Sequence, residues 1–297
     1  MHRIGILLCL LLTGCTDFLA QRAVEPPWGR LGSALFVLVP EKHDVTELRV
    51  PVGPPNTELA VWVMEPQTAT KGTVLVLHGI AADHHQIEGA AAALREAGYR
   101  AVMVDLRGHG QTKADHITYG VADARDLTQL TTYLQEHKLC GKTVGVFGTS
   151  YGAATAILFA GADPRVTAVV AVAPYASVRQ EVPHFARVFA PLPGWFMSDE
   201  DFREEVEAMG RYGGFDPDAA DAVAAIRKTS AQVRLFHGTW DLITPCEASK
   251  EIAAAAPDHT ELTLVPGAGH LWLCLDPLGL LHRETREWYD RYLGDGQ

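Results

Sequence analysis

Apolar runs rich in β-branched residues alternate along most of this chain with stretches in which apolar residues recur at helical spacing. The runs lie at residues 73–79, 100–106, 142–148 and 166–173, and the helical stretches between them lie at 85–98, 121–137 and 151–161. A continuous apolar run is typical of a strand that is buried on both faces. The alternation therefore predicts an α/β fold, with a mostly parallel sheet and helices on both of its faces.

The alternation has a different form at the start of this region and is interrupted once later. Residues 46–52 and 58–64 are alternating apolar runs around GPPNT, which predicts an antiparallel pair. Residues 176–230 contain helical stretches and no strand pattern, and such a long insertion in a compact domain is usually functional. The alternation then resumes at 232–238, 246–256, 261–266 and around 279–293. We expect one α/β domain over residues 46–297, with a helical lid insertion at about 176–230.

The first residues are typical of an exported protein. Arg3 precedes an apolar run from Ile4 to Leu12, which is too short to span a bilayer and fits the apolar core of a secretory signal. The ending Leu12-Thr13-Gly14-Cys15 resembles the lipobox of bacterial lipoproteins. We therefore expect a signal peptide at 1–14, lipids on Cys15 and a tether over 15–45; the alternative is a plain signal peptide.

The resemblance to lipoproteins also implies a location. Acyl chains on Cys15 would anchor the protein to a membrane on the periplasmic face of the cell envelope. In such lipoproteins an Asp directly after the cysteine tends to cause retention in the inner membrane, and this chain has Thr16 there, so the outer membrane is favoured. The formal net charge of −11 argues against a nucleic-acid partner, because phosphates would be repelled.

The segment KTVGVFGTSYGAATAILFA, residues 142–160, places Gly-x-Ser-x-Gly between a predicted strand and a predicted helix. That context favours a nucleophile elbow, in which Ser150 stands on a sharp turn above the sheet. Gly148 and Gly152 fit the close approach of strand and helix at such a turn. A bland surface turn is the alternative, and the flanking strand and helix argue against it.

A serine nucleophile needs a base and a group that orients the base. Asp241 follows the run at 232–238, and His270 follows the run at 261–266, so both lie at the carboxyl edge of the sheet with Ser150. We expect His270 to take the serine proton and Asp241 to orient the imidazole. The backbone amides of Tyr151 and Ile80 are predicted to form the oxyanion hole.

Four stretches give the chain a resemblance to the α/β-hydrolase superfamily over about residues 45–295. They are LHGI at 77–80, DLRGHGQT at 105–112, GTSYG at 148–152, and HGTWD with GAGH. The resemblance implies the same triad of Ser150, Asp241 and His270, and the same oxyanion hole. TYGVADARDL at 118–127 is similar to the serine-aminopeptidase-like and acyl-transferase-like branches.

Several other residues are candidates for shaping the site. His78, Trp240 and Trp272 lie next to predicted site residues in sequence, and Trp195 and Phe196 belong to the insertion; all five are predicted to line the substrate pocket. An aromatic roof over the serine would favour acyl groups of about eight carbons or fewer. In the superfamily, residues at the positions of Asp105, Arg107 and His109 mostly brace loops, whereas Arg125 and Asp126 are predicted to form a surface pair.

The remaining candidate residues are a group that could ligate a metal and a pair of cysteines that could form a disulfide. Asp83, His84 and His85 match no zinc spacing, so we predict a solvated helix start and no metal site. Cys246 and Cys274 each follow a predicted triad member, and either a disulfide or two separate buried thiols fits this placement.

The sequence predicts a serine hydrolase that cleaves small-molecule carboxylic esters through an acyl-enzyme intermediate, without a cofactor. One alternative is an exopeptidase or amidase with the same triad, in which Glu200, Asp201, Glu204 and Glu205 would bind a peptide amine. Another is a non-catalytic binding protein of the same fold.

Overall fold

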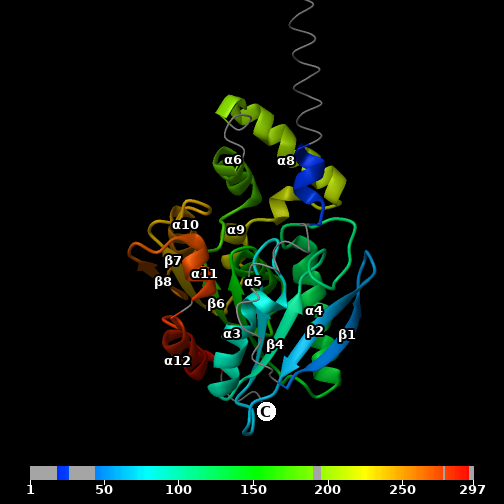
Figure 1. Cartoon of the computed structure of the whole chain (residues 1–297), viewed down its shortest axis with the longest axis vertical. Coiled ribbons are helices and arrows are strands. Elements are labelled where there is room, and N and C mark those ends of the chain that lie inside the picture. Colours follow the sequence, from blue (N-terminus) through cyan, green and yellow to red (C-terminus); the bar gives the residue numbers. More distant parts are fainter. Residues whose placement is uncertain (1–18, 27–43, 190–194, 277, 294–297) are drawn as a thin grey trace, which may run out of the picture.

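An eight-stranded sheet runs through the computed structural model, which describes residues 19–26, 44–189, 195–276 and 278–293 (Figure 1). The strands are β1 Thr46–Val52, β2 Thr57–Met64, β3 Thr73–Leu77, β4 Arg100–Asp105, β5 Val144–Thr149, β6 Val166–Val172, β7 Gln232–Gly238 and β8 Thr260–Val265. Their order across the sheet is β1-β2-β4-β3-β5-β6-β7-β8. β2 is antiparallel to both β1 and β4, and the other pairs are parallel.

Helices pack on both faces of this sheet. They are α3 His84–Glu96, α4 Val121–Glu136, α5 Tyr151–Ala162, α10 Glu247–Ala255, α11 His270–Leu275 and α12 His282–Tyr292. Side chains of α4, α5 and α10 share one buried cluster with the sheet, and side chains of α3, α11 and α12 share the other. The mostly parallel sheet with helices on both faces confirms the fold class predicted from the sequence.

The strand sequences account for the two clusters. Successive side chains of a strand point to opposite faces, so a strand that is covered twice must be apolar at every position. In β3, Leu75 and Leu77 belong to the cluster with α5, whereas Val74 and Val76 belong to the cluster with α3. All four are fully buried, and burying a side chain of this size contributes about 1.5–3 kcal/mol.

The segment between β6 and β7 forms a cap beyond the carboxyl ends of the parallel strands (Figure 1). It contains α6 Val178–Phe189, α8 Asp199–Gly213, the 3₁₀ turn η1 Pro217–Ala219 and α9 Ala222–Ile226. Ser198 caps α8 by accepting from the Asp201 amide, while the Asp201 carboxylate accepts from the Ser198 amide. Helices thus occupy much of the described part of residues 176–230, and the bounds of the insertion and its role as a lid remain predictions.

The predicted N-terminal segments are covered only in part. The signal peptide at 1–14 and Cys15 lie outside the described residues. Within the predicted tether, residues 19–24 are helical, and Ala20 and Val24 are buried against the domain. Tyr119 Oη donates to the Ala23 carbonyl over 2.8 Å, so this part of the tether is docked. None of the described helices is both long enough and apolar enough to cross a membrane.

Candidate active site

Ser150 lies at the turn between β5 and α5 in a backbone conformation that serine rarely adopts, with φ 52° and ψ −116°. The flanking glycines make the turn possible. A Cβ on Gly148 would lie 2.3 Å from the Gly152 carbonyl oxygen, and one on Gly152 would lie 2.5 Å from the His78 carbonyl oxygen. No side chain fits at either position, so the turn has the geometry of a nucleophile elbow.

Three side chains form a hydrogen-bonded chain at the carboxyl edge of the sheet. Ser150 Oγ lies 2.9 Å from His270 Nε2, and His270 Nδ1 lies 2.6 Å from Asp241 Oδ2. Asp241 follows β7, and His270 begins α11 shortly after β8. The structure thus brings together the three residues that the sequence predicts as a triad, although they are far apart in sequence.

Asp241 is held ionised by its surroundings. Burial on its own would raise the pKa of this carboxyl, but contacts with His237 and His270 outweigh burial and hold the pKa well below its usual range. Asp241 Oδ1 also accepts from the amides of Ile243 and Thr244 at 3.0 and 2.9 Å. An ionised carboxylate fixed in this way can orient an imidazole and stabilise its cation.

His270 has an environment suited to a positive charge. Burial lowers the pKa of this imidazole, but the Cys274 sulfur and the Asp241 carboxylate raise it above its usual value. An imidazolium formed when His270 takes a proton from Ser150 is therefore stabilised in place. Because Nδ1 is engaged with Asp241, Nε2 is the nitrogen that faces the serine.

The two predicted oxyanion-hole residues lie on either side of Ser150. Tyr151 is the first residue of α5, where a backbone N–H has no acceptor within its own helix. Ile80 follows β3, and a Cβ on the preceding Gly79 would lie 3.5 Å from Ser150 Cβ, so this loop lies beside the nucleophile. The Gly79 amide donates to Gln86 Oε1 at 2.7 Å, which fixes the loop on α3. The donor roles of Tyr151 and Ile80 remain predictions.

The prediction that His78 lines the substrate pocket is wrong. Its side chain is fully buried, and Nε2 accepts from the Leu106 amide at 3.0 Å. Nδ1 lies 2.7 Å from the Gly79 carbonyl oxygen. With both ring nitrogens occupied, His78 joins the loops after β3 and β4 and has no group left for a substrate.

The predicted aromatic residues are more exposed than a closed pocket would require. Trp195 and Phe196 are 70% and 85% exposed, and their contact with substrate remains a prediction. Trp240 and Trp272 flank the site at 73% and 39% exposure, and their contact with substrate remains a prediction.

Asp105 at the end of β4 and Arg107 in the loop after it brace the structure, as predicted. Asp105 accepts from the amides of His84 and Gln111. Arg107 donates from Nε and Nη2 to the two carboxylate oxygens of Asp126, over 2.8 and 2.9 Å, and both side chains are buried. The prediction of a surface pair between Arg125 and Asp126 is therefore wrong, because Asp126 faces inward from α4.

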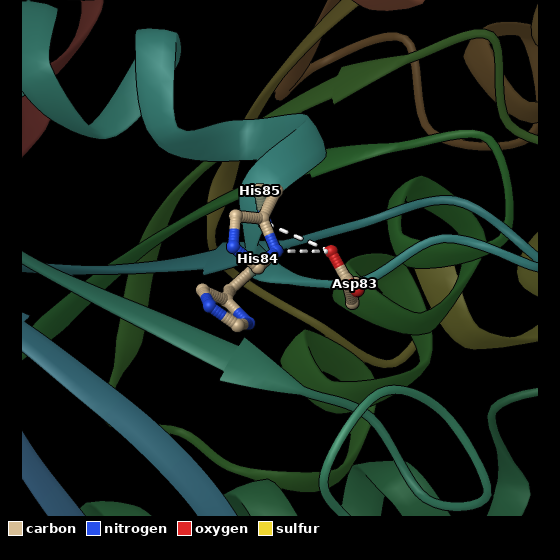
Figure 2. A group of neighbouring side chains, drawn as sticks. All are labelled: Asp83, His84 and His85. Carbon is tan, nitrogen blue, oxygen red and sulfur yellow. Dashed lines mark hydrogen bonds and ion pairs between the residues drawn. The ribbon is translucent and has the colours of Figure 1, made fainter. Parts of the chain in front are cut away.

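Asp83, His84 and His85 lie together at the start of α3, as Figure 2 shows. Each offers one possible ligand atom, and these atoms lie within 4.8 Å of one another. Asp83 Oδ1 accepts from the His85 amide and lies 2.9 Å from His85 Nδ1, as the dashed lines indicate. His84 Nδ1 lies 3.0 Å from an Asp105 oxygen and its ring stacks on Trp62. Helix capping and stacking account for this arrangement.

The cysteines in the described residues are free thiols. Cys246 and Cys274 are both buried, and the alternative of two separate thiols therefore holds. Cys246 precedes α10 beside Glu247, whereas Cys274 lies one turn after His270 on α11.

The structure adds two residues that the sequence analysis did not single out. Thr244 lies in the loop after β7 and contacts Asp241, and Glu181 on α6 accepts from Thr244 Oγ1 at 2.9 Å. No sequence motif marks either residue, because only the packing of cap helix α6 against that loop brings them to the site.

Parts of this chain are similar in sequence to known proteins. Residues 68–212 match the serine aminopeptidase (S33) family. An uncharacterized Bacillus subtilis protein, YqkD, is 24% identical over 186 residues, which are 62% of this chain and 59% of that protein's length.

Solved structures match over more of the chain. The Pyrococcus furiosus esterase Pf2001 has a TM-score of 0.70 at 20% identity, with 92% of this chain and 99% of that chain covered. The esterase domain of a Rhodothermus marinus protein has a TM-score of 0.61 at 18% identity, with 84% of this chain and 100% of that chain covered. With the sheet order, the elbow at Ser150 and the cap after β6, these matches identify the architecture of this chain as the α/β-hydrolase fold.

Proposed function

We propose that this chain is a serine hydrolase that cleaves carboxylic esters through an acyl-enzyme intermediate. The hydrogen-bonded chain from Ser150 through His270 to Asp241 carries the proposal. His270 takes the proton of Ser150 as Oγ attacks the ester carbonyl, and it returns a proton to the leaving alkoxide. The amides of Tyr151 and Ile80 stabilise the oxyanion, and water then releases the acid by the same steps.

The preference for esters is supported by the surroundings of the serine and by the comparisons. Apolar side chains that flank the site are exposed. They are Ile80, Trp240 and Leu242 on loops, and Leu271 and Trp272 on α11. Such a rim suits an uncharged, partly apolar substrate. Two of the matched structures are named as esterases. The rim residues are therefore candidates for contact with the acyl group.

A hydrolysis screen tests the reaction type. The full chain is offered p-nitrophenyl esters of increasing acyl length, thioesters and aminoacyl anilides, with Ser150→Ala as the control. Ester hydrolysis that depends on Ser150 supports the proposal. Faster hydrolysis of the anilides would favour the exopeptidase, which the match to the serine aminopeptidase family makes the second candidate.

A non-catalytic binding protein with this fold is distinguished by labelling. A fluorophosphonate probe reacts with an activated serine, so it should label the native chain and not the Ser150→Ala variant. A native chain that resists the probe and hydrolyses none of the substrates would indicate the binding protein.

We also propose that the protein is anchored to the membrane through lipids on Cys15. The apolar run from Ile4 to Leu12 and the sequence before Cys15 support this. Mass spectrometry of the membrane fraction should find Cys15 as the acylated N-terminal residue. A Cys15→Ala variant that stays in the membrane fraction to the same extent would contradict the anchor.

A further inference from the structure

Two contacts join cap helix α6 to the loop that carries Asp241. Glu181 accepts from Thr244 Oγ1 at 2.9 Å. His184 lies one turn further along α6, and its Nε2 lies 2.8 Å from the Leu242 carbonyl oxygen. The same face of one cap helix therefore contacts the loop at two points close to Asp241.

Thr244 links this helix to Asp241. Its amide donates to Asp241 Oδ1 at 2.9 Å, and its hydroxyl donates to Glu181. Its carbonyl oxygen lies 2.8 Å from His237 Nε2. The residue is buried, and each of its polar groups has a partner, so its orientation is set jointly by Asp241, Glu181 and His237.

We infer that Glu181 is a positioning residue for the reaction, through which cap helix α6 holds Thr244 against Asp241 and places a second carboxylate near His270. This inference rests on the proposed function. It assigns to the cap a role besides covering the substrate. A displacement of α6 would release Thr244 and weaken the hydrogen bond that helps to fix Asp241.

The charge of Glu181 adds an electrostatic effect. Burial, together with the negative charge of Asp241, raises the pKa of this carboxyl to about 7, although the hydrogen bond from Thr244 and the attraction of a charged His270 lower it. The interaction with His270 is reciprocal: an ionised Glu181 stabilises the imidazolium. That cation forms as Ser150 is deprotonated, so the ionised carboxylate favours the transition state.

Other ionisable groups near α6 have partners of their own. Arg179 pairs with Glu207 and Asp218, and Arg187 pairs with Asp199. Gln180 on α6 donates to Glu251 of α10. Burial raises the pKa values of Tyr119 and Tyr175, to which Glu181 adds a smaller contribution, and both phenols are neutral. The ionisable groups that influence Glu181 itself are thus Asp241 and His270.

The test compares Glu181→Gln with Gln180→Ala in the full chain. A glutamine carbonyl can still accept from Thr244, so this substitution removes mainly the charge. On a p-nitrophenyl ester, Glu181→Gln should lower kcat about fivefold with little change in KM. The acid limb of its kcat/KM profile should move to lower pH, because His270 loses a neighbouring negative charge. Gln180→Ala, one residue along the same helix, should match the native chain.

Thr244 provides the second pair of variants. Thr244→Val removes the hydroxyl and should lower kcat. Thr244→Ser keeps the hydroxyl and should therefore have a kcat close to that of the native chain. If Glu181→Gln and Thr244→Val keep the native kcat and pH profile, the inference is overturned. The inference is also overturned if the variants lose activity only in parallel with a lower Tm, while the acid limb of the pH profile is unchanged. A native chain that neither hydrolyses esters nor reacts with a fluorophosphonate refutes the proposed function instead.

Discussion

Ser150 holds a positive φ because the chain places glycines on both sides of it and a buried helix start behind it. A non-glycine residue in such a conformation costs of order 1–3 kcal/mol, and it persists only where the surroundings determine it. Here the strain places the hydroxyl within 2.9 Å of His270. The motif of five residues and the strand and helix patterns on either side of it are visible in the sequence, which is why Ser150 could be predicted.

Replacement of Ser150 with Ala should lower kcat on the preferred ester by at least ~10⁴, because the three side chains act as a unit. The fold should remain, since alanine removes only the hydroxyl. Steady-state kinetics with circular dichroism as the control would measure both effects. Turnover near the native value would show that another residue is the nucleophile.

Asp241→Asn should lower kcat by up to ~10⁴, since an amide can hold His270 in the wrong tautomer. The pKa of Asp241 lies below its usual range, so this residue is ionised throughout the neutral range in the native chain. The rate at several pH values measures the loss. A variant with native activity would mean that another acid orients His270.

Glu181 and Thr244 could not be predicted from the sequence as residues of the site. Asp241 and His270 could be placed because each directly follows a strand, and the carboxyl ends of parallel strands meet at one edge. Glu181 lies within an ordinary helical stretch, and only the packing of α6 brings it to Thr244. The prediction that His78 lines the pocket was wrong for a different reason. The sequence shows that His78 follows a strand, but it does not show that the side chain is buried.

The elbow joins β5 to α5 so closely that two of its positions exclude a Cβ. Gly152→Ala would place a methyl group 2.5 Å from the His78 carbonyl oxygen, which is backbone and cannot turn aside. We expect Gly152→Ala to lower both Tm and kcat. Gly89→Ala is the matched control, because no atom lies within 4 Å of its added Cβ and alanine favours a helix. Equal Tm values for the two variants would refute the close approach.

The loop after β4 is joined to α4 by the buried pair of Arg107 and Asp126. Removal of one partner leaves an uncompensated buried charge, which typically costs 3–5 kcal/mol. Asp126→Ala should therefore lower the free energy of unfolding by roughly that amount, as measured in urea. Arg125→Ala, the adjacent position on α4, should cause little change. Similar midpoints for both variants would contradict the inward orientation of Asp126.

The strands and the long helices were predicted within a few residues because their apolar periods are strong over their whole length. The cap was predicted only as a helical insertion. The sequence shows that Trp195 and Phe196 are apolar, but not whether a neighbouring element covers them, and both are exposed. The helical turn at 19–24 was assigned to a tether for a related reason, since its burial depends on distant residues of the domain.

At the scale of the molecule, four of the buried carboxyl groups that the structure describes form two pairs with opposite dependences of stability on pH. Asp105 and Asp241 have lowered pKa values in spite of burial, because they accept hydrogen bonds from histidines. Their contribution is present above the ordinary pKa of 3.8 and is lost as the pH falls below it. Burial raises the pKa of Asp123 to about 6 and that of Glu205 to about 7. The contribution of these four carboxyl groups to stability should therefore be greatest at mildly acidic pH.

Glu205 on α8 gives this expectation its sharpest test. Its Oε2 is buried and has no hydrogen-bond partner among the described residues. Between the ordinary pKa of 4.5 and about 7, the folded chain keeps a proton that the unfolded chain has released, so stability falls as the pH rises through this window. Glutamine carries no charge to bury. Glu205→Gln should have the native Tm near pH 4.5 and a Tm several degrees higher at pH 8, since each kcal/mol shifts Tm by about 2–4 °C in a domain of this size.

Glu204→Gln is the matched control, because its side chain is exposed on the same helix and should change Tm at neither pH. Scanning calorimetry at pH 4.5 and pH 8 gives the difference in Tm between each variant and the native chain. If Glu205→Gln lowers Tm equally at both, then the carboxyl contributes a hydrogen bond in its neutral form that glutamine cannot replace, and the charge is not what limits stability. If both variants gain equally at pH 8, the gain comes from the reduced net charge of −11, not from the burial of Glu205.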